Sequence, residues 1–136
     1  MNSNRIDGLD LGKIGFGCLQ LEGLPEEMAE NVIVQAYGMG VRLFDTAAAY
    51  GNDRHNEKIL ANAVAKIRNI YGETANVFVS TKCGINFATM GAKTRGYEGS
   101  PHQIHESLPS TLISFNVSRQ SYFLYCSYYC SYCRRQ

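Results

Sequence analysis

Apolar residues in the first 112 positions follow two patterns: the short runs typical of buried β-strands and the three-to-four-residue spacing of amphipathic helices. The strand-like runs cover residues 11–18, 41–44 and 77–81. Helical spacing follows two of these runs, over residues 25–37 and 56–70. Ser100 and Pro101 are residue types favoured at the N-cap and the first helical position, so they predict a third helix over residues 102–112.

Each of the two longer helical segments predicts one buried face. The first helix is expected to begin near Pro25 and to be stopped by Gly38 and Gly40. Its predicted face consists of Met28, Val32 and Ala36, with Ile33 and Tyr37 as further candidates. The face predicted for the second helix consists of Leu60, Ala63, Val64 and Ile67.

Strand and helix alternate three times, which predicts an α/β fold with a parallel sheet and right-handed crossovers. Polar side chains stand where two of these strands end. Asp45 and Tyr50 follow the second strand, and Lys82 closes the third. Because parallel strands place their carboxyl ends at one edge of the sheet, where α/β folds carry their active sites, we expect these three residues to meet there.

These residue types form an acid-catalysis group for a carbonyl compound. An ordinary tyrosine has a pKa of about 10 and is a slow proton donor at neutral pH. A lysine ammonium beside a phenol favours the phenolate and so makes the phenol a better donor. Asp45 can hold Lys82 charged and in place. The alternative is that Asp45 is a surface acid, Tyr50 a core tyrosine and Lys82 an ordinary residue at a strand end.

Composition narrows the class of protein further. The chain has 136 residues, 45% hydrophobic and 18% charged, with a net charge of +1, so one globular domain is expected and no nucleic-acid partner. There is no long apolar run and no signal-type N-terminus, so we expect no membrane partner and a cytoplasmic location. The odd number of cysteines, five, argues against a disulfide framework.

The last part of the chain differs from the rest. Residues 113–136 are rich in cysteine, serine and tyrosine and show neither helical nor strand periodicity. Cys126, Cys130 and Cys133 have the spacing of an iron–sulfur motif, but the Cys-Ser-Tyr repetition produces that spacing by chance and we expect no metal. We therefore predict a domain over residues 1–112 and a tail, residues 113–136, outside the fold.

Several motifs in the first part resemble one family. They are residues 11–18, 40–47, 50–51, 56–60, 81–84 and 99–108, and in this order they resemble the aldo-keto reductases. That family folds as a (β/α)₈ TIM barrel and transfers hydride from NADPH to a small aldehyde or ketone. The resemblance implies that Tyr50 is the proton donor, that Lys82 assists it, and that Asp45 pairs with Lys82 beside the nicotinamide. It also implies that Gly17 and Cys18 contact the cofactor.

The chain departs from the family after Leu112. A complete barrel needs about 250 residues, so this chain is expected to supply about the first three βα units. The family's fourth catalytic residue is a histidine after strand four, but no histidine follows His105 and no fourth strand is predicted. The function expected from the resemblance is NADPH-dependent carbonyl reduction, impaired in a truncated chain. The alternative is a non-enzymatic remnant or binding protein of the same ancestry.

Overall fold

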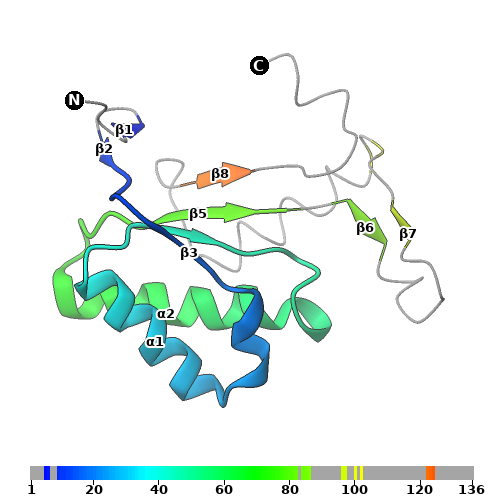
Figure 1. Cartoon of the computed structure of the whole chain (residues 1–136), viewed down its shortest axis with the longest axis horizontal. Helices are drawn as coiled ribbons and strands as arrows, with labels where there is room; N and C mark the ends of the chain where they lie inside the picture. The colour runs from blue at the N-terminus through cyan, green and yellow to red at the C-terminus, as the bar shows by residue number, and fades with distance from the viewer. Residues whose placement is uncertain are drawn as a thin grey trace.

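The computed structural model describes residues 5–6, 9–82, 84–86, 96–97, 100, 102 and 122–124. The elements of its two β-α-β units are, in chain order, β3 (Gly15–Gly17), α1 (Glu26–Gly38), β4 (Leu43–Asp45), α2 (His55–Tyr71) and β5 (Phe78–Thr81). Figure 1 shows both α-helices on the same face of the sheet. This arrangement of two consecutive β-α-β units confirms the predicted α/β class.

The main sheet has four parallel strands in the order β3-β4-β5-β8. Strand β8 (Tyr122–Leu124) runs beside β5, with Ser80 opposite Phe123 (Figure 1). These three residues belong to the segment expected to lie outside the fold, and they occupy the fourth-strand position for which the sequence predicts no strand. Parallel pairing joins residues far apart in the chain, so the local pattern carries no signal for it. Apart from β8, residues 113–136 are outside the described part of the chain.

Two small antiparallel pairs and two short 3-10 helices complete the described elements. β1 (Arg5–Ile6) pairs with β2 (Leu9–Asp10), and β6 (Ile85–Asn86) pairs with β7 (Gly96–Tyr97). The 3-10 helices are η1 (Leu19–Gly23), after β3, and η2 (Asn52–Arg54), before α2. The third helix predicted over residues 102–112 falls outside the described residues except at His102.

The core lies between the sheet and the two helices. All four residues of the face predicted for α2 are buried, as is Phe44 of β4. The face predicted for α1 is right in part: Ile33 and Tyr37 are buried, Val32 and Ala36 are partly buried, but Met28 is 53% exposed and the unpredicted Ala29 is buried instead. Since apolar residues occupy almost every position from 32 to 37, periodicity alone does not select the face.

Polar side chains also connect the two helices. Glu30 of α1 is buried and accepts hydrogen bonds from Lys66 (2.7 Å) and Asn62 (2.9 Å) of α2. The hydrogen bond from Lys66 is the largest influence on Glu30 and holds the pKa of its carboxyl below the ordinary value. Within the part of the chain that the structure describes, no helix combines the length and apolar character needed to cross a membrane.

Candidate active site

The three predicted catalytic residues meet at the carboxyl ends of β4 and β5. Asp45 is the last residue of β4, Lys82 follows β5 directly, and Tyr50 lies in the loop that leads from β4 to α2. The parallel register places Asp45 opposite Ser80, and the N–H of Thr46 donates to the carbonyl of Ser80 at 2.7 Å. The two strand ends are thereby fixed side by side, which brings the three side chains together as predicted.

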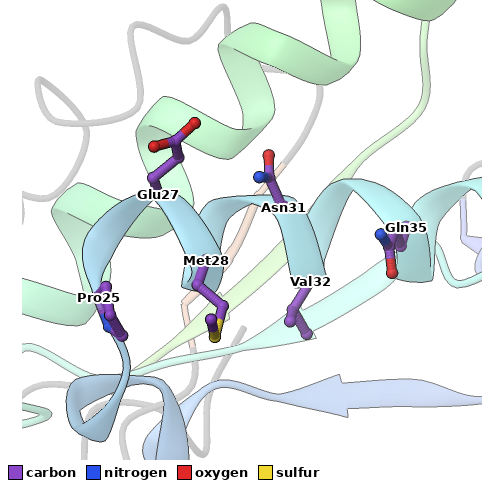
Figure 2. A pocket seen from close by; sticks show the side chains of 6 residues that line it. All are labelled: Pro25, Glu27, Met28, Asn31, Val32 and Gln35. Atoms are coloured by element: carbon purple, nitrogen blue, oxygen red, sulfur yellow. The ribbon is translucent and has the colours of Figure 1, made fainter.

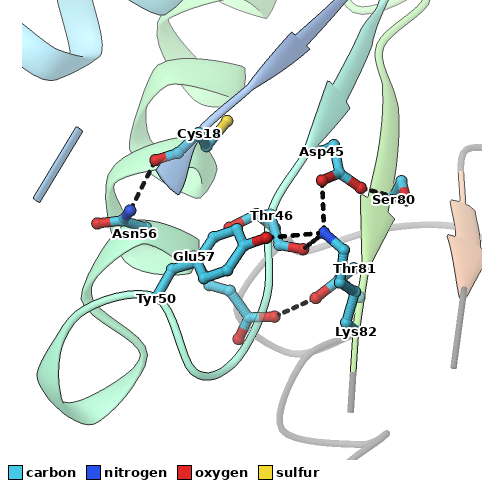
Figure 3. Close-up of polar contacts among 9 residues, drawn as sticks. All are labelled: Cys18, Asp45, Thr46, Tyr50, Asn56, Glu57, Ser80, Thr81 and Lys82. Carbon is cyan, nitrogen blue, oxygen red and sulfur yellow. Dashed lines mark hydrogen bonds and ion pairs between the residues drawn. The ribbon is translucent and has the colours of Figure 1, made fainter. Parts of the chain in front are cut away.

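The ammonium of Lys82 is the centre of this cluster, as Figure 3 shows. It donates to Asp45 Oδ2, to the backbone carbonyl of Thr46 (3.0 Å) and to the phenol oxygen of Tyr50 (3.1 Å). An ammonium has three protons, so these three acceptors use all of them. Because the phenol oxygen of Tyr50 accepts from Lys82, its own proton remains available to another acceptor.

Asp45 is held at both carboxylate oxygens. Oδ2 pairs with Lys82, and Oδ1 accepts a hydrogen bond from Ser80 Oγ at 2.8 Å. Ser80 is absent from the sequence prediction. Its position two residues before Lys82 could have indicated that it lies beside the cluster, because residues i and i+2 of a strand point to the same face.

The local electrostatics keep Lys82 charged. Partial burial acts to lower its pKa, but the hydrogen bonds to Asp45 and Tyr50 and the charge of Asp45 outweigh it, so the pKa of Lys82 is raised above the ordinary value. The side chain is 23% exposed and that of Asp45 40% exposed, which leaves the cluster open to a small molecule.

The two other predicted site residues, Gly17 and Cys18, differ sharply in accessibility. Gly17 pairs with Asp45 in the sheet register, is exposed, and a Cβ added to it would meet no atom within 4 Å. The Cys18 thiol lies in the core, where burial, and secondarily the charge of Asp45, raises its pKa to about 12. Its N–H donates to Asp45 O (2.8 Å) and its carbonyl accepts from Asn56 Nδ2 (2.7 Å), so its backbone groups are also engaged.

The loop that carries Tyr50 has an unusual backbone. Gly51 has φ +75°, and a Cβ there would lie 2.7 Å from His55 Cβ. Asp53 and Arg54 also have positive φ, at 50° and 59°, although neither is glycine. Such conformations are costly for L-residues and persist only where surrounding contacts hold them. Here the N–H of Asn56 donates to the carbonyl of Tyr50 at 3.2 Å and closes the loop.

An open groove of about 530 Å³ lies elsewhere, along the exposed side of α1. Figure 2 shows its side chains, with Met28 and Val32 pointing to the same side of the helix. Its lining residues are Pro25, Glu27, Met28, Asn31, Val32 and Gln35. They include none of the predicted catalytic residues. Among the described residues, no three metal-binding side chains converge.

Comparison with known proteins identifies the family. The sequence profile of the Aldo/keto reductase family matches residues 13–126, a range that includes β8. The probable aldo-keto reductase 1 of Glycine max is 30% identical over 115 residues, which are 81% of this chain and 31% of that protein. An aldo-keto reductase of Gibberella moniliformis is 32% identical over 103 residues, 72% of this chain and 30% of that one.

Solved structures agree in fold. A glycerol dehydrogenase of Gluconobacter oxydans superimposes with a TM-score of 0.68 at 25% identity, covering 86% of this chain and 37% of that one. The holo form of an aldo-keto reductase of Bacillus halodurans gives a TM-score of 0.66 at 24% identity, covering 86% and 37%. The chain spans about a third of the length of the curated relatives above. Its fold is confirmed as part of a TIM barrel, and the chain belongs to the Aldo/keto reductase family of oxidoreductases.

Proposed function

We propose that this chain carries the proton-donating part of an NADPH-dependent carbonyl reductase, with small aldehydes or ketones as substrates. The observation that carries the proposal is the contact of Lys82 Nζ with Tyr50 OH at 3.1 Å while the same ammonium pairs with Asp45. This arrangement supports proton donation by Tyr50 and distinguishes the cluster from three unrelated polar residues.

Tyr50 is the general acid in this proposal. As its proton moves to the carbonyl oxygen of the substrate, negative charge develops on the phenol oxygen. The Lys82 ammonium, 3.1 Å away, stabilises that charge. Asp45 keeps Lys82 protonated and oriented, and Ser80 in turn fixes Asp45. The substrate gains a proton at oxygen and a hydride at carbon, and so becomes an alcohol.

The residues at this edge fit one side of a nicotinamide ring. Gly17 leaves bare backbone without any side chain beside Asp45, so a flat ring can approach closely. Asp45 offers a partly exposed carboxylate at the same place. When bound, reduced NADPH supplies the hydride. Gly17 and Asp45 would contact it, whereas the buried thiol and the engaged backbone of Cys18 leave that residue without a free group for the role.

The second candidate is a non-catalytic protein that binds a partner or cofactor. The specific observation in its favour is that no histidine follows β8, where the family resemblance implies the fourth catalytic residue.

The test is NADPH oxidation by the purified full chain with a panel of small aldehydes and ketones. Tyr50→Phe is compared with Tyr71→Phe, which removes a phenol hydroxyl at a half-exposed position at the end of α2. We expect turnover to fall at least tenfold in Tyr50→Phe, as general acid catalysis contributes about 10²–10⁴-fold, and to persist in Tyr71→Phe. Equal turnover in Tyr50→Phe and the parent chain would refute the acid role. NADPH binding without turnover in the parent chain would favour the second candidate.

A further inference from the structure

The first turn of α2 contacts the ends of two strands of the sheet, β3 and β5. Asn56 and Glu57, its second and third residues, are both fully buried. Side chains at the start of a helix are more often solvated, and burying a carboxylate carries a large desolvation cost. Two consecutive buried polar residues at this place therefore need a reason, and their partners supply one.

Asn56 connects β3 to the Tyr50 loop. Its side-chain amide donates to the carbonyls of Cys18 (2.7 Å) and Leu19 (3.2 Å), directly after β3. Its backbone N–H donates to the carbonyl of Tyr50 at 3.2 Å. A single residue thus fixes the backbone that carries the phenol relative to the strand that carries Gly17.

Glu57 connects the same turn to β5. Its Oε1 accepts a hydrogen bond from Thr81 Oγ1 at 2.7 Å, and its Oε2 lies 3.1 Å from Arg54 Nε. Thr81 directly precedes Lys82, and successive strand residues point to opposite faces. The Thr81 hydroxyl therefore points back to Glu57 while Lys82 points to Tyr50, as Figure 3 shows.

We propose that Asn56 and Glu57 are positioning residues of the active site, which hold Tyr50 and Lys82 at the separation that proton donation needs. The inference rests on the proposed function for its catalytic meaning, but the contacts exist independently of it. The N–H of Asn56 holds the backbone carbonyl of Tyr50, and Glu57 holds Thr81, the residue before Lys82. One helical turn therefore positions both residues of the 3.1 Å contact between Lys82 and Tyr50. A displacement of about 1 Å between reacting groups can reduce a rate by about 10²-fold.

The chain contains a matched control for a purely structural role. Glu30, like Glu57, is a buried glutamate with a hydrogen-bond donor and a basic residue as partners. Its partners are Asn62 and Lys66, so it connects α1 to α2 rather than to a strand end. Glu30→Gln and Glu57→Gln make the same chemical change at two buried carboxylates. Only Glu57 has a partner next to a catalytic residue.

The readout is the titration of the Lys82 side chain in the full chain, followed by NMR of lysine labelled with ¹³C at Cε and assigned with Lys82→Arg. The titratable groups that interact with Lys82 are Asp45 and Tyr50, by hydrogen bonds and charge, and Cys18, by charge alone. The contacts with Asp45 and Tyr50 raise the pKa of Lys82. We expect Glu57→Gln and Thr81→Val to lower the pKa of Lys82 in the same direction as Asp45→Asn. Thr81→Ser keeps the hydroxyl and is expected to restore the parent titration. Glu30→Gln is expected to lower the melting temperature and leave the Lys82 titration unchanged.

Two results distinguish a failure of the positioning role from a failure of the proposed function. If Lys82 of the parent chain titrates at the ordinary lysine value, the Asp45–Lys82–Tyr50 arrangement and the proposed function are both contradicted. If the parent pKa is raised and Thr81→Val leaves it unchanged, the positioning role alone is overturned. Should Glu57→Gln fail to fold, the pair Thr81→Val and Thr81→Ser decides the question. Where turnover is measurable, the proposal also requires Thr81→Val to lower kcat with little change in KM.

Discussion

Gly51 follows Tyr50 in the loop that leads to α2, and replacing it by alanine tests how tightly that loop is packed against the helix. The new Cβ would sit 2.7 Å from His55 Cβ and 3.5 Å from Asn56 Oδ1, at a residue with φ +75°. With ψ at 172°, Gly51 occupies a backbone region that is essentially restricted to glycine and costs an L-residue on the order of 1–3 kcal/mol. A carbon–carbon contact this far below the ordinary ~3.5–4.0 Å adds an overpacking cost of about 1–3 kcal/mol. The sum predicts a loss of about 2–6 kcal/mol in the free energy of unfolding.

Alanine substitutions at two other glycines separate the backbone cost from the overpacking cost. Gly40 has φ +101° and no atom within 4 Å of an added Cβ, so Gly40→Ala measures the backbone cost alone. Gly23→Ala has neither a positive φ nor a close atom, and it serves as the neutral control. In urea denaturation followed by circular dichroism, we expect Gly51→Ala to lose the most stability, Gly40→Ala about 1–3 kcal/mol, and Gly23→Ala little.

The comparison can refute the reasoning directly. If Gly51→Ala loses no more stability than Gly40→Ala, the loop relaxes around the new methyl group, and the close approach of Gly51 to His55 does not constrain it. The same relaxation would move Tyr50 relative to α2, so the Lys82 titration of Gly51→Ala provides an independent check.

Three further predictions concern the core and the buried titratable groups. Ile33→Ala should cost about 2–5 kcal/mol in urea denaturation, whereas Met28→Ala should change stability by only about 0.5 kcal/mol; the reverse order would contradict the burial of Ile33 and the exposure of Met28. Glu30→Gln should be less stable than the parent at neutral pH, because the lowered pKa of Glu30 stabilises the fold above its unfolded-state pKa. This difference should shrink as the pH falls through the folded-state pKa, and a pH-independent difference would contradict it. Cys18, with a pKa of about 12, should resist iodoacetamide at neutral pH until the chain unfolds, as judged by peptide mass mapping; alkylation of the native chain would disprove its burial.

The sequence predicts the parts of the site that depend on chain order and strand ends. Asp45, Tyr50 and Lys82 are predictable because parallel strands bring consecutive strand ends to one edge of the sheet. The roles assigned to them stay predictions. The face of α2 is also predictable, because Leu60, Ala63, Val64 and Ile67 recur at the three- and four-residue spacing of a single helical stripe.

The other features of the site and the fold depend on contacts that no local sequence pattern encodes. Asn56 and Glu57 look like ordinary polar residues of a helix start, and only the packing of α2 against strand ends buries them. The face of α1 is ambiguous for the opposite reason, since residues 32–37 offer apolar side chains in nearly every direction. Strand β8 comes from a segment without strand periodicity, and its place follows from the unpaired edge of β5 that accepts it.

The three hydrogen bonds of the Lys82 ammonium also determine which chemistry this site avoids. An amine beside an aldehyde condenses to an imine only through its neutral form, with a free lone pair on nitrogen. Lys82 has its three protons committed to Asp45, Thr46 and Tyr50, and its pKa is raised, so that lone pair is absent at neutral pH. Under the proposed function, an aldehyde substrate therefore lies beside this lysine without covalent capture.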